Sequence, residues 1–173
     1  MNYSEIKSAD VANGDGIRVS LFVSGCSNKC KGCFNPQTWD FNFGKLFDEK
    51  IEDEIISLLN RPYINGLTLL GGDPFELSNQ PVLDKFLDKV KKALPEKTIW
   101  AYTGYVLEKD LLTENGRAHC ECTRNFLSKI DVLVDGPFVE ALKDISLRFR
   151  GSSNQRIINL KDSDLANNVI VCQ

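Results

Sequence analysis

Three cysteines at close spacing are the feature of this sequence best suited to chemistry. Cys26, Cys30 and Cys33 form the pattern C-x-x-x-C-x-x-C. Thiolates bind soft metals, chiefly zinc, copper(I) and the iron of iron–sulfur clusters. Structural zinc sites and the familiar ferredoxin motifs supply four protein ligands, whereas this loop supplies three. A cluster held by three cysteines leaves one iron open to a reacting molecule, so the spacing favours a catalytic iron–sulfur cluster.

Spacing alone leaves alternatives open. A zinc site in a small interaction module would need a remote fourth ligand, which Cys120, Cys122, Cys172 or the only histidine, His119, could supply. The three thiols of the loop could also be unrelated buried side chains. The segment around His119 resembles an insertion, and with Cys172 it is a candidate accessory metal site. The two tryptophans, Trp39 and Trp100, are expected to fill the core.

The composition indicates a globular protein in a reducing compartment. Hydrophobic residues make up 42% and charged residues 26%, and 21 basic residues face 24 acidic ones without a dense basic tract. No apolar stretch approaches the roughly 20 residues of a membrane span, and the first residues lack the pattern of a secretory signal. We therefore expect a cytoplasmic protein that binds neither membrane nor nucleic acid directly, with cysteines that stay reduced.

Short apolar strands alternate with helices along the chain. Strands are expected at 17–23, 67–70, 98–102 and 130–134, and less regular ones at 155–160 and 169–172. Helices are expected at 48–59 and 78–90, with a broken helical stretch at 106–129. The alternation predicts a single α/β domain over 1–173, with its core at about 13–160 and a C-terminal extension at 161–173. Its mostly parallel sheet is expected to form a partial (β/α) barrel.

The ends of the first four strands define the expected site. The carboxyl ends of parallel strands meet at one edge of a sheet, where ligands bind. Each of the four strands runs into a segment that contains glycine, where a backbone can approach a ligand closely. These segments are 24–26, 71–74, 103–105 and 135–138. The cysteine loop is therefore expected to share its site with the other three segments.

An ordered set of motifs, spread over most of residues 1–160, resembles the radical S-adenosylmethionine enzymes. More closely, it resembles the activating proteins of anaerobic (class III) ribonucleotide reductase. The matching segments are NGDGIR (13–18), LFVSGC (21–26), CKGCFNPQTWDF (30–41), GLTLLGGDP (66–74), IWAYTGY (99–105), DVLVDGPF (131–138) and RGSSNQR (150–156).

The resemblance implies an activity and its cofactors. A [4Fe-4S] cluster on Cys26, Cys30 and Cys33 would cleave S-adenosylmethionine to a 5′-deoxyadenosyl radical. That radical would take hydrogen from a glycine of the reductase large subunit, with flavodoxin or ferredoxin as electron donor. No catalytic residue beyond the cluster and cofactor is implied. Activation of another glycyl radical enzyme, such as pyruvate formate-lyase, is the alternative within this class.

The resemblance also assigns contacts with S-adenosylmethionine. They fall on Gly32, Cys33, Phe34, Gly71, Gly72, Asp73 and Pro74. Gly32 stands where relatives carry an aromatic residue, so Phe34 is expected either near the nucleoside or in the core. Thr103 and Asp135 are candidates for contacts with the ribose or the carboxylate, or for caps of local turns. The loops at 13–16 and 150–156 are expected to receive the glycine loop of the reductase.

Overall fold

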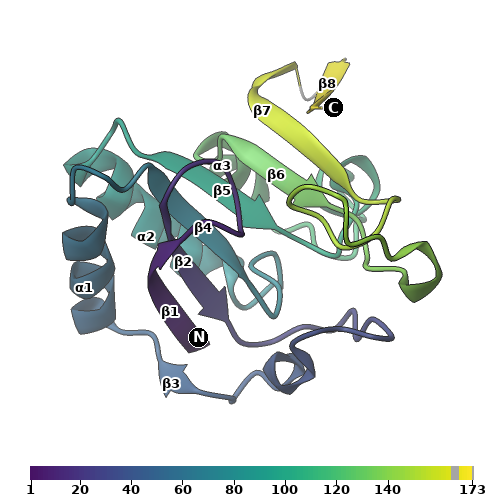
Figure 1. Ribbon diagram of the computed structural model, residues 1–173, viewed down its shortest axis with the longest axis horizontal. Helices are drawn as coiled ribbons and strands as arrows, with labels where there is room; N and C mark the ends of the chain where they lie inside the picture. Colours follow the sequence, from purple (N-terminus) through teal and green to yellow (C-terminus); the bar gives the residue numbers. More distant parts are fainter. Residues whose placement is uncertain (165–167, 173) are drawn as a thin grey trace.

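The computed structural model describes residues 1–164 and 168–172, which form one eight-stranded sheet with helices against it (Figure 1). The strand order is β3-β1-β2-β4-β5-β6-β7-β8. The strands are β1 (Asn2–Asp10), β2 (Arg18–Val23), β3 (Lys45–Leu46), β4 (Gly66–Gly71), β5 (Thr98–Tyr102), β6 (Val132–Asp135), β7 (Arg156–Asp164) and β8 (Asn168–Cys172). All six expected strands are therefore present, and β1 and β3 are additional.

The prediction of a mostly parallel sheet in a partial barrel is wrong. Only the central strands β2, β4, β5 and β6 pair in parallel, and four of the seven pairings in the sheet are antiparallel. The prediction extended to the sheet as a whole the helical crossovers expected between its first four strands. Instead, β1 reaches β2 through a loop, and β6 reaches β7 through a long loop with one short 3-10 helix (Glu140–Leu142), so these pairs can run antiparallel.

Three α-helices pack against one face of the sheet (Figure 1). They are α1 (Glu49–Leu59), α2 (Gln80–Ala93) and the short α3 (Thr123–Ser128). The side chain of Asp48 accepts a hydrogen bond from the Ile51 amide and caps α1, as the sequence suggests. The broken stretch at 106–129 contains a π-helix (Leu107–Leu111), a turn and α3.

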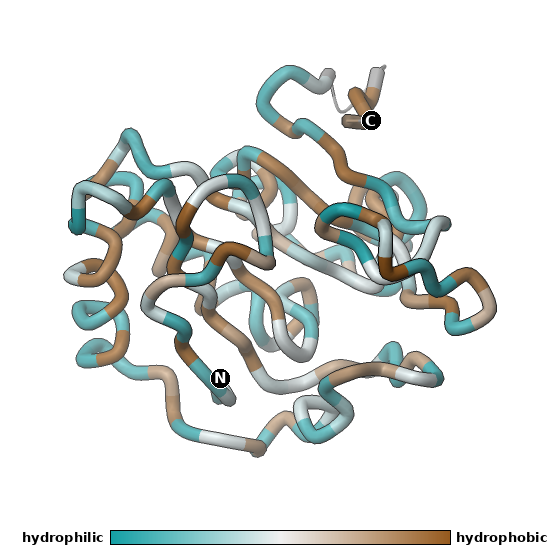
Figure 2. Tube along the Cα trace, viewed as in Figure 1, coloured by the Kyte–Doolittle hydropathy of each residue, from teal (hydrophilic) through white to brown (hydrophobic). Residues whose placement is uncertain are grey.

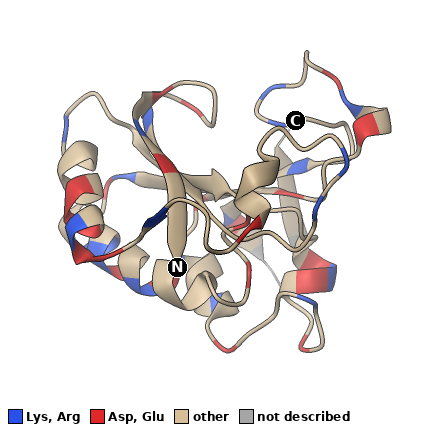
Figure 3. Ribbon diagram, turned by 90° about the horizontal axis from the view of Figure 1, so that it is seen from below, with Lys and Arg blue, Asp and Glu red and all other residues tan. Residues whose placement is uncertain are grey.

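The core lies between the central strands and the helices. Leu21, Leu69 and Leu133 from the sheet and Leu83 and Phe86 from α2 are completely buried there. Figure 2 shows hydrophobic residues along the central strands, and Figure 3 shows acidic and basic residues interspersed over the ribbon. None of the helices in the described part of the chain is long and apolar enough to cross a bilayer.

The other face of the sheet carries a buried arginine. Arg18 donates five hydrogen bonds, to the hydroxyls of Thr68 and Thr98 and to the carbonyl oxygens of Asp15, Leu67 and Thr98. Its guanidinium also lies 5.5 Å from the ring centroid of Trp100. Burial lowers the Arg18 pKa to about 10, so the group remains charged at neutral pH. Arg18 therefore ties β2, β4 and β5 together beside the site.

Replacing Arg18 with methionine is expected to lower the free energy of unfolding by about 2–4 kcal/mol. Methionine fills much of the volume, but it leaves buried acceptors without donors. Urea denaturation followed by circular dichroism measures the loss. The matched control is Arg61→Met, because Arg61 is exposed and its side chain donates a single hydrogen bond within the described residues, to the Tyr63 hydroxyl. Equal stability of the two variants would contradict the structural role of Arg18.

Candidate functional site

A cavity of about 450 Å³ opens at the carboxyl ends of the parallel strands. Its walls come from the cysteine loop, the exits of β4, β5 and β6, and the loop between β6 and β7. The predicted residues among its lining are Cys26, Cys30, Gly32, Cys33, Phe34, Gly71, Gly72, Asp73 and Thr103. Pro74 and Asp135 are not among the lining residues. The four strand ends thus meet at one site, as expected from the sequence.

The cysteine loop is shaped by residues in the left-handed region of φ. Gly25, Lys29 and Gly32 have φ values of 95°, 46° and 75°. Backbone amides point at the sulfurs: the Asn35 amide donates to Cys33 Sγ at 3.4 Å, and the amides of Asn28 and Lys29 donate to Cys26. Such donors stabilise thiolates and the sulfurs of a cluster. The donor set and its amides therefore fit an iron–sulfur cluster.

The thiols of Cys26 and Cys30 are buried enough to remain protonated without a metal. Burial raises the pKa of the Cys26 thiol to about 12, and the nearby Asp73 carboxylate raises it further, while the amides of Asn28 and Lys29 act in the opposite direction. Burial also raises the pKa of Cys30. A metal bound here would have to displace these protons.

Glu76 holds the cysteine loop in place, and sequence reasoning missed it. Its carboxylate is buried and accepts hydrogen bonds from the Ser27 amide at 2.6 Å, the Ser27 hydroxyl at 2.7 Å and the Tyr105 hydroxyl at 3.0 Å. These contacts fix the residue that follows Cys26. The only signal in the sequence was the position of Glu76 just after the second glycine-containing strand end.

Gly71 and Gly72 bring the exits of β4 and β2 into close contact. The Gly72 amide donates to the Val23 carbonyl at 2.7 Å, and the Asp73 amide donates to the Gly25 carbonyl at 2.8 Å. A Cβ on Gly72 would lie 2.4 Å from the Gly25 carbonyl oxygen. The sequence suggested that these glycines admit a ligand. The structure shows that the packing of the two strand exits also requires them.

Asp73 lies at the centre of a hydrogen-bond network. Its carboxylate accepts from the Thr103 hydroxyl at 2.8 Å, the Gly104 amide at 2.8 Å, the Phe75 amide at 2.9 Å and the Asn28 side chain at 3.1 Å. Burial raises its pKa to about 7, against the lowering effect of the Gly104 amide. Asp73 therefore joins the exits of β4 and β5 to the cysteine loop.

Asp135 is engaged away from the cavity. Its carboxylate pairs with the Arg156 guanidinium at 2.9 and 2.5 Å and accepts from the Leu107 amide at 2.8 Å. This is the local capping role that the sequence left open as the alternative. Thr103, in contrast, lines the cavity and donates to Asp73.

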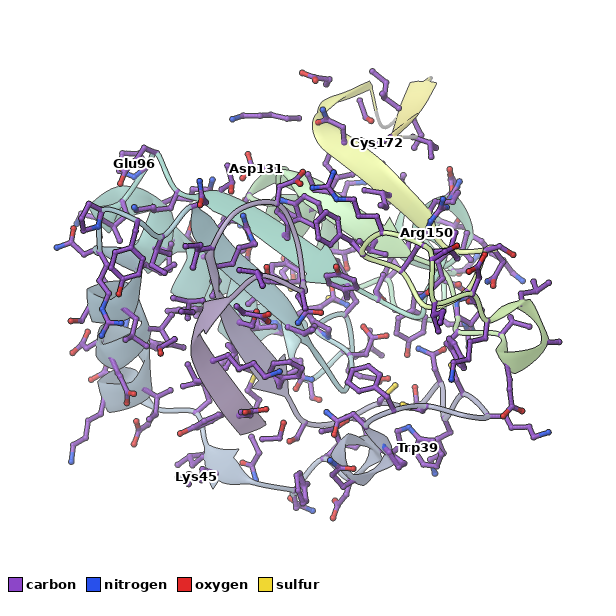
Figure 4. The ribbon with its side chains drawn as sticks, viewed as in Figure 1. Trp39, Lys45, Glu96, Asp131, Arg150 and Cys172 are labelled. Carbon is purple, nitrogen blue, oxygen red and sulfur yellow. The ribbon has the colours of Figure 1, made fainter. Side chains whose placement is uncertain are left out.

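Three buried polar atoms on residues that line the cavity have no hydrogen-bond partner within the described ranges. They are Trp39 Nε1, the Tyr102 hydroxyl and Arg150 Nε. Figure 4 shows Trp39 and Arg150 on different loops of the site. A bound polar ligand would supply the missing partners. The assignment of Trp39 to the core was therefore wrong, while Trp100 is buried as expected.

Phe34 lies at the mouth of the cavity rather than in the core. Phe34 is 79% exposed, and Ile145, which also lines the cavity, is 94% exposed. A Cβ on Gly32 would lie 3.0 Å from the Glu140 carboxylate, because the loop after β6 passes over this turn. Of the two alternatives for Phe34, the core position is thus wrong.

The accessory metal site is not assembled. In residues 1–164 and 168–172, no group of three or more His, Cys, Asp or Glu is placed to bind one metal ion. His119 uses Nδ1 in a hydrogen bond with the Leu111 carbonyl, and Cys172 lies on β8, the strand at one edge of the sheet (Figure 1). The three loop cysteines do not converge on a single ion either. A cubane cluster does not require this, since each thiolate binds a different iron atom.

The sequence of the chain matches known proteins over almost its whole length. Residues 12–158 match the family described as a 4Fe-4S single cluster domain. The chain is 45% identical over 163 residues to the anaerobic ribonucleoside-triphosphate reductase-activating protein of Haemophilus influenzae, an alignment that covers 93% of this chain and 99% of the relative. The chain belongs to this family of activating proteins. The members from Escherichia coli K12 and Enterobacteria phage T4 are 42% and 41% identical and are covered over 100% and 93% of their lengths.

Membership of this family confirms the resemblance to the activating proteins of anaerobic ribonucleotide reductase, and the match to a 4Fe-4S domain supports an iron–sulfur cluster. The 4Fe-4S domain spans all three loop cysteines and the lining of the cavity up to the start of β7. The cysteine loop and the glycine pair therefore lie inside the region that the family shares.

Proposed function

We propose that this protein activates an anaerobic ribonucleotide reductase by a radical S-adenosylmethionine mechanism. The observation that carries the proposal is the cavity in which three cysteines, and no fourth, face the glycine pair and unpartnered polar atoms. When bound, a [4Fe-4S] cluster would supply the electron that splits S-adenosylmethionine into methionine and a 5′-deoxyadenosyl radical, which removes hydrogen from a glycine of the reductase.

Different residues of the cavity would bind the cluster and S-adenosylmethionine. Cys26, Cys30 and Cys33 would hold the cluster. The side chains of Trp39 and Tyr102 would donate hydrogen bonds to polar groups of S-adenosylmethionine, because their buried donors lack partners in the described structure. Asp73 already accepts several hydrogen bonds. It would therefore keep the cysteine loop and Thr103 in position as well as contact the ligand.

The mouth of the cavity is where the reductase would dock. Exposed apolar side chains are enriched in sites of protein interaction, and Phe34 and Ile145 face solvent beside the opening. Asn13 and Arg150, from the loops expected to receive the glycine segment, also line the cavity. We therefore propose that the glycine of the partner enters between these two loops. A flavodoxin or ferredoxin remains the expected electron donor.

The test combines the reconstituted protein with candidate partners. The chain is loaded anaerobically with iron and sulfide, reduced, and mixed with S-adenosylmethionine and either anaerobic ribonucleotide reductase or pyruvate formate-lyase. We expect a brown protein, release of 5′-deoxyadenosine, and a glycyl radical signal in electron paramagnetic resonance with the reductase. A signal only with the lyase would reassign the target. A brown protein without turnover would indicate an electron carrier, and a colourless zinc protein would overturn the cluster.

Replacing Ile145 with aspartate is expected to reduce the glycyl radical yield on the reductase about ten-fold, which corresponds to about 1.4 kcal/mol of lost docking energy. Ile145 is almost fully exposed, so the fold should tolerate the change. The release of 5′-deoxyadenosine without partner should stay unchanged. The matched control is Ile170→Asp on β8, which should retain full yield. Equal yields from both variants would place the docking surface elsewhere.

A further inference from the structure

Two cysteines outside the cavity lie in contact in the turn that precedes α3. Cys120 and Cys122 form a C-x-C sequence, and their sulfurs are 3.4 Å apart. Both side chains are partly exposed, so reagents from solution can reach them. Neither residue lines the cavity, and the proposed function uses neither thiol.

A buried glutamine fixes the pair to the rest of the protein. Gln80 is completely buried, and its Oε1 accepts from the Thr123 hydroxyl at 2.7 Å and from the Cys120 thiol at 3.6 Å. Its Nε2 donates to the carbonyls of Ala118 at 2.8 Å and Phe75 at 2.7 Å. Both the amide oxygen and the amide nitrogen of Gln80 therefore hydrogen-bond the turn that carries the two thiols.

The distance between the sulfurs suits reversible oxidation. A disulfide bond is about 2.05 Å long, so the sulfurs need to approach by about 1.3 Å, which rotation about the side-chain bonds of a surface turn can provide. A C-x-C disulfide closes a small ring with strained geometry, and strained or exposed disulfides are the readily reduced ones. Such a pair returns easily to the dithiol.

We propose that Cys120 and Cys122 form a redox-active dithiol that exchanges with low-molecular-weight disulfides such as glutathione disulfide. The thiolate of one cysteine attacks the disulfide, forms a mixed disulfide and releases one thiolate. The second cysteine then displaces the other half, so two protein thiols become one disulfide and the small disulfide becomes two thiols. Two electrons and two protons pass from the protein to the small molecule, and the reaction balances without a further oxidant.

The order of attack follows from the environment of the two sulfurs. Burial raises the pKa of Cys122 to about 12, and the adjacent Cys120 sulfur raises it further. The Thr123 hydroxyl donates to the Cys120 sulfur at 3.3 Å and would stabilise a thiolate there, which favours Cys120 as the attacking thiol and Cys122 as the resolving one. Oxidation also removes the thiol proton that Cys120 donates to Gln80.

Mass spectrometry of the full-length protein tests the proposal. The chain, loaded with its cluster, is incubated anaerobically with glutathione disulfide, treated with N-ethylmaleimide and digested. We expect the peptide that contains both cysteines to lose two hydrogens and to take up no maleimide. Dithiothreitol before labelling should restore two maleimide groups. The result does not depend on activity, so it stands or falls separately from the proposed function.

Two variants identify the roles of the sulfurs. With Cys122→Ser, the resolving thiol is absent, and Cys120 should retain glutathione as a mixed disulfide. With the matched control Cys172→Ser, the bond between Cys120 and Cys122 should form as in the unmodified chain. The proposal is overturned if both thiols of the unmodified chain still react with maleimide after excess glutathione disulfide, or if either one is linked to a different cysteine.

Discussion

Replacement of Cys30 with serine is expected to abolish glycyl radical formation and to leave the folded protein without its full iron and sulfide content. A serine hydroxyl is a hard and weakly acidic ligand, whereas iron in sulfide clusters requires thiolates. No other thiol could replace Cys30, because the three remaining cysteines of the chain, Cys120, Cys122 and Cys172, do not line the cavity. We expect activity to fall by at least about 100-fold, since even outer-shell groups of metal sites are worth up to that amount.

Three measurements check the Cys30→Ser variant: iron and sulfide content, release of 5′-deoxyadenosine, and the glycyl radical signal on the reductase. Its circular dichroism should match that of the unmodified chain, because Cys30 lies in a partly exposed loop outside the core. Cys172→Ser is the matched control and should keep its cluster, since Cys172 lies on β8 away from the cavity. Full turnover by Cys30→Ser would show that this residue does not hold the cluster.

Replacement of Gly71 with alanine is expected to lower the free energy of unfolding by about 3–5 kcal/mol. Gly71 has a φ of 115°, which costs an L-residue about 1–3 kcal/mol. Its added Cβ would also lie 2.6 Å from the Val23 amide nitrogen, and such overpacking typically costs a further 1–3 kcal/mol or so. Because β2 and β4 are paired there, relief of the clash separates the exits that carry the cysteine loop and the glycine pair.

Gly136→Ala separates the two causes. Gly136 has a similar φ of 97°, but the nearest atom to its added Cβ would be 3.7 Å away, an ordinary contact. In this control, only the backbone strain should lower the free energy of unfolding. Urea denaturation should therefore show Gly71→Ala to be less stable than Gly136→Ala by about 1–3 kcal/mol. Equal losses for the two variants would mean that β4 can move away from β2 without cost.

The site was more predictable than the sheet that carries it. The cysteine spacing and the glycine-containing strand ends pointed to one shared cavity because the central strands are short, apolar and joined by helices. β1 was not predicted, since its sequence, NYSEIKSAD, is mostly polar and most of its side chains are only partly buried or exposed. β1 is stabilised by its pairing with β2 and β3, and hydrophobic periodicity does not report such pairing between separate segments.

Several contacts around the site depend on packing between segments that are far apart in the sequence, which the spacing of residues along the chain does not predict. Glu76 supports Ser27 from a turn nearly 50 residues farther along the chain, and Arg156 binds Asp135 across the antiparallel pairing of β6 and β7. Trp39 was predicted to lie in the core because the sequence alone does not distinguish an aromatic side chain in a core from one in a cavity wall. Only the arrangement of loops shows that its indole nitrogen has no partner in the described structure.

The sequence by itself determined the candidate ligands and the chemistry proposed for them, because thiol number, thiol spacing and glycine positions are local properties that the chain carries before it folds. The tertiary structure alone decided which of the candidate residues meet. It brought Thr103 and Asp73 into the cavity wall, kept Asp135 in an ion pair, exposed Phe34 at the mouth, and placed Cys120 beside Cys122. The physical reason is that long-range strand pairing and loop packing set these distances, and both depend on the whole fold rather than on neighbouring residues.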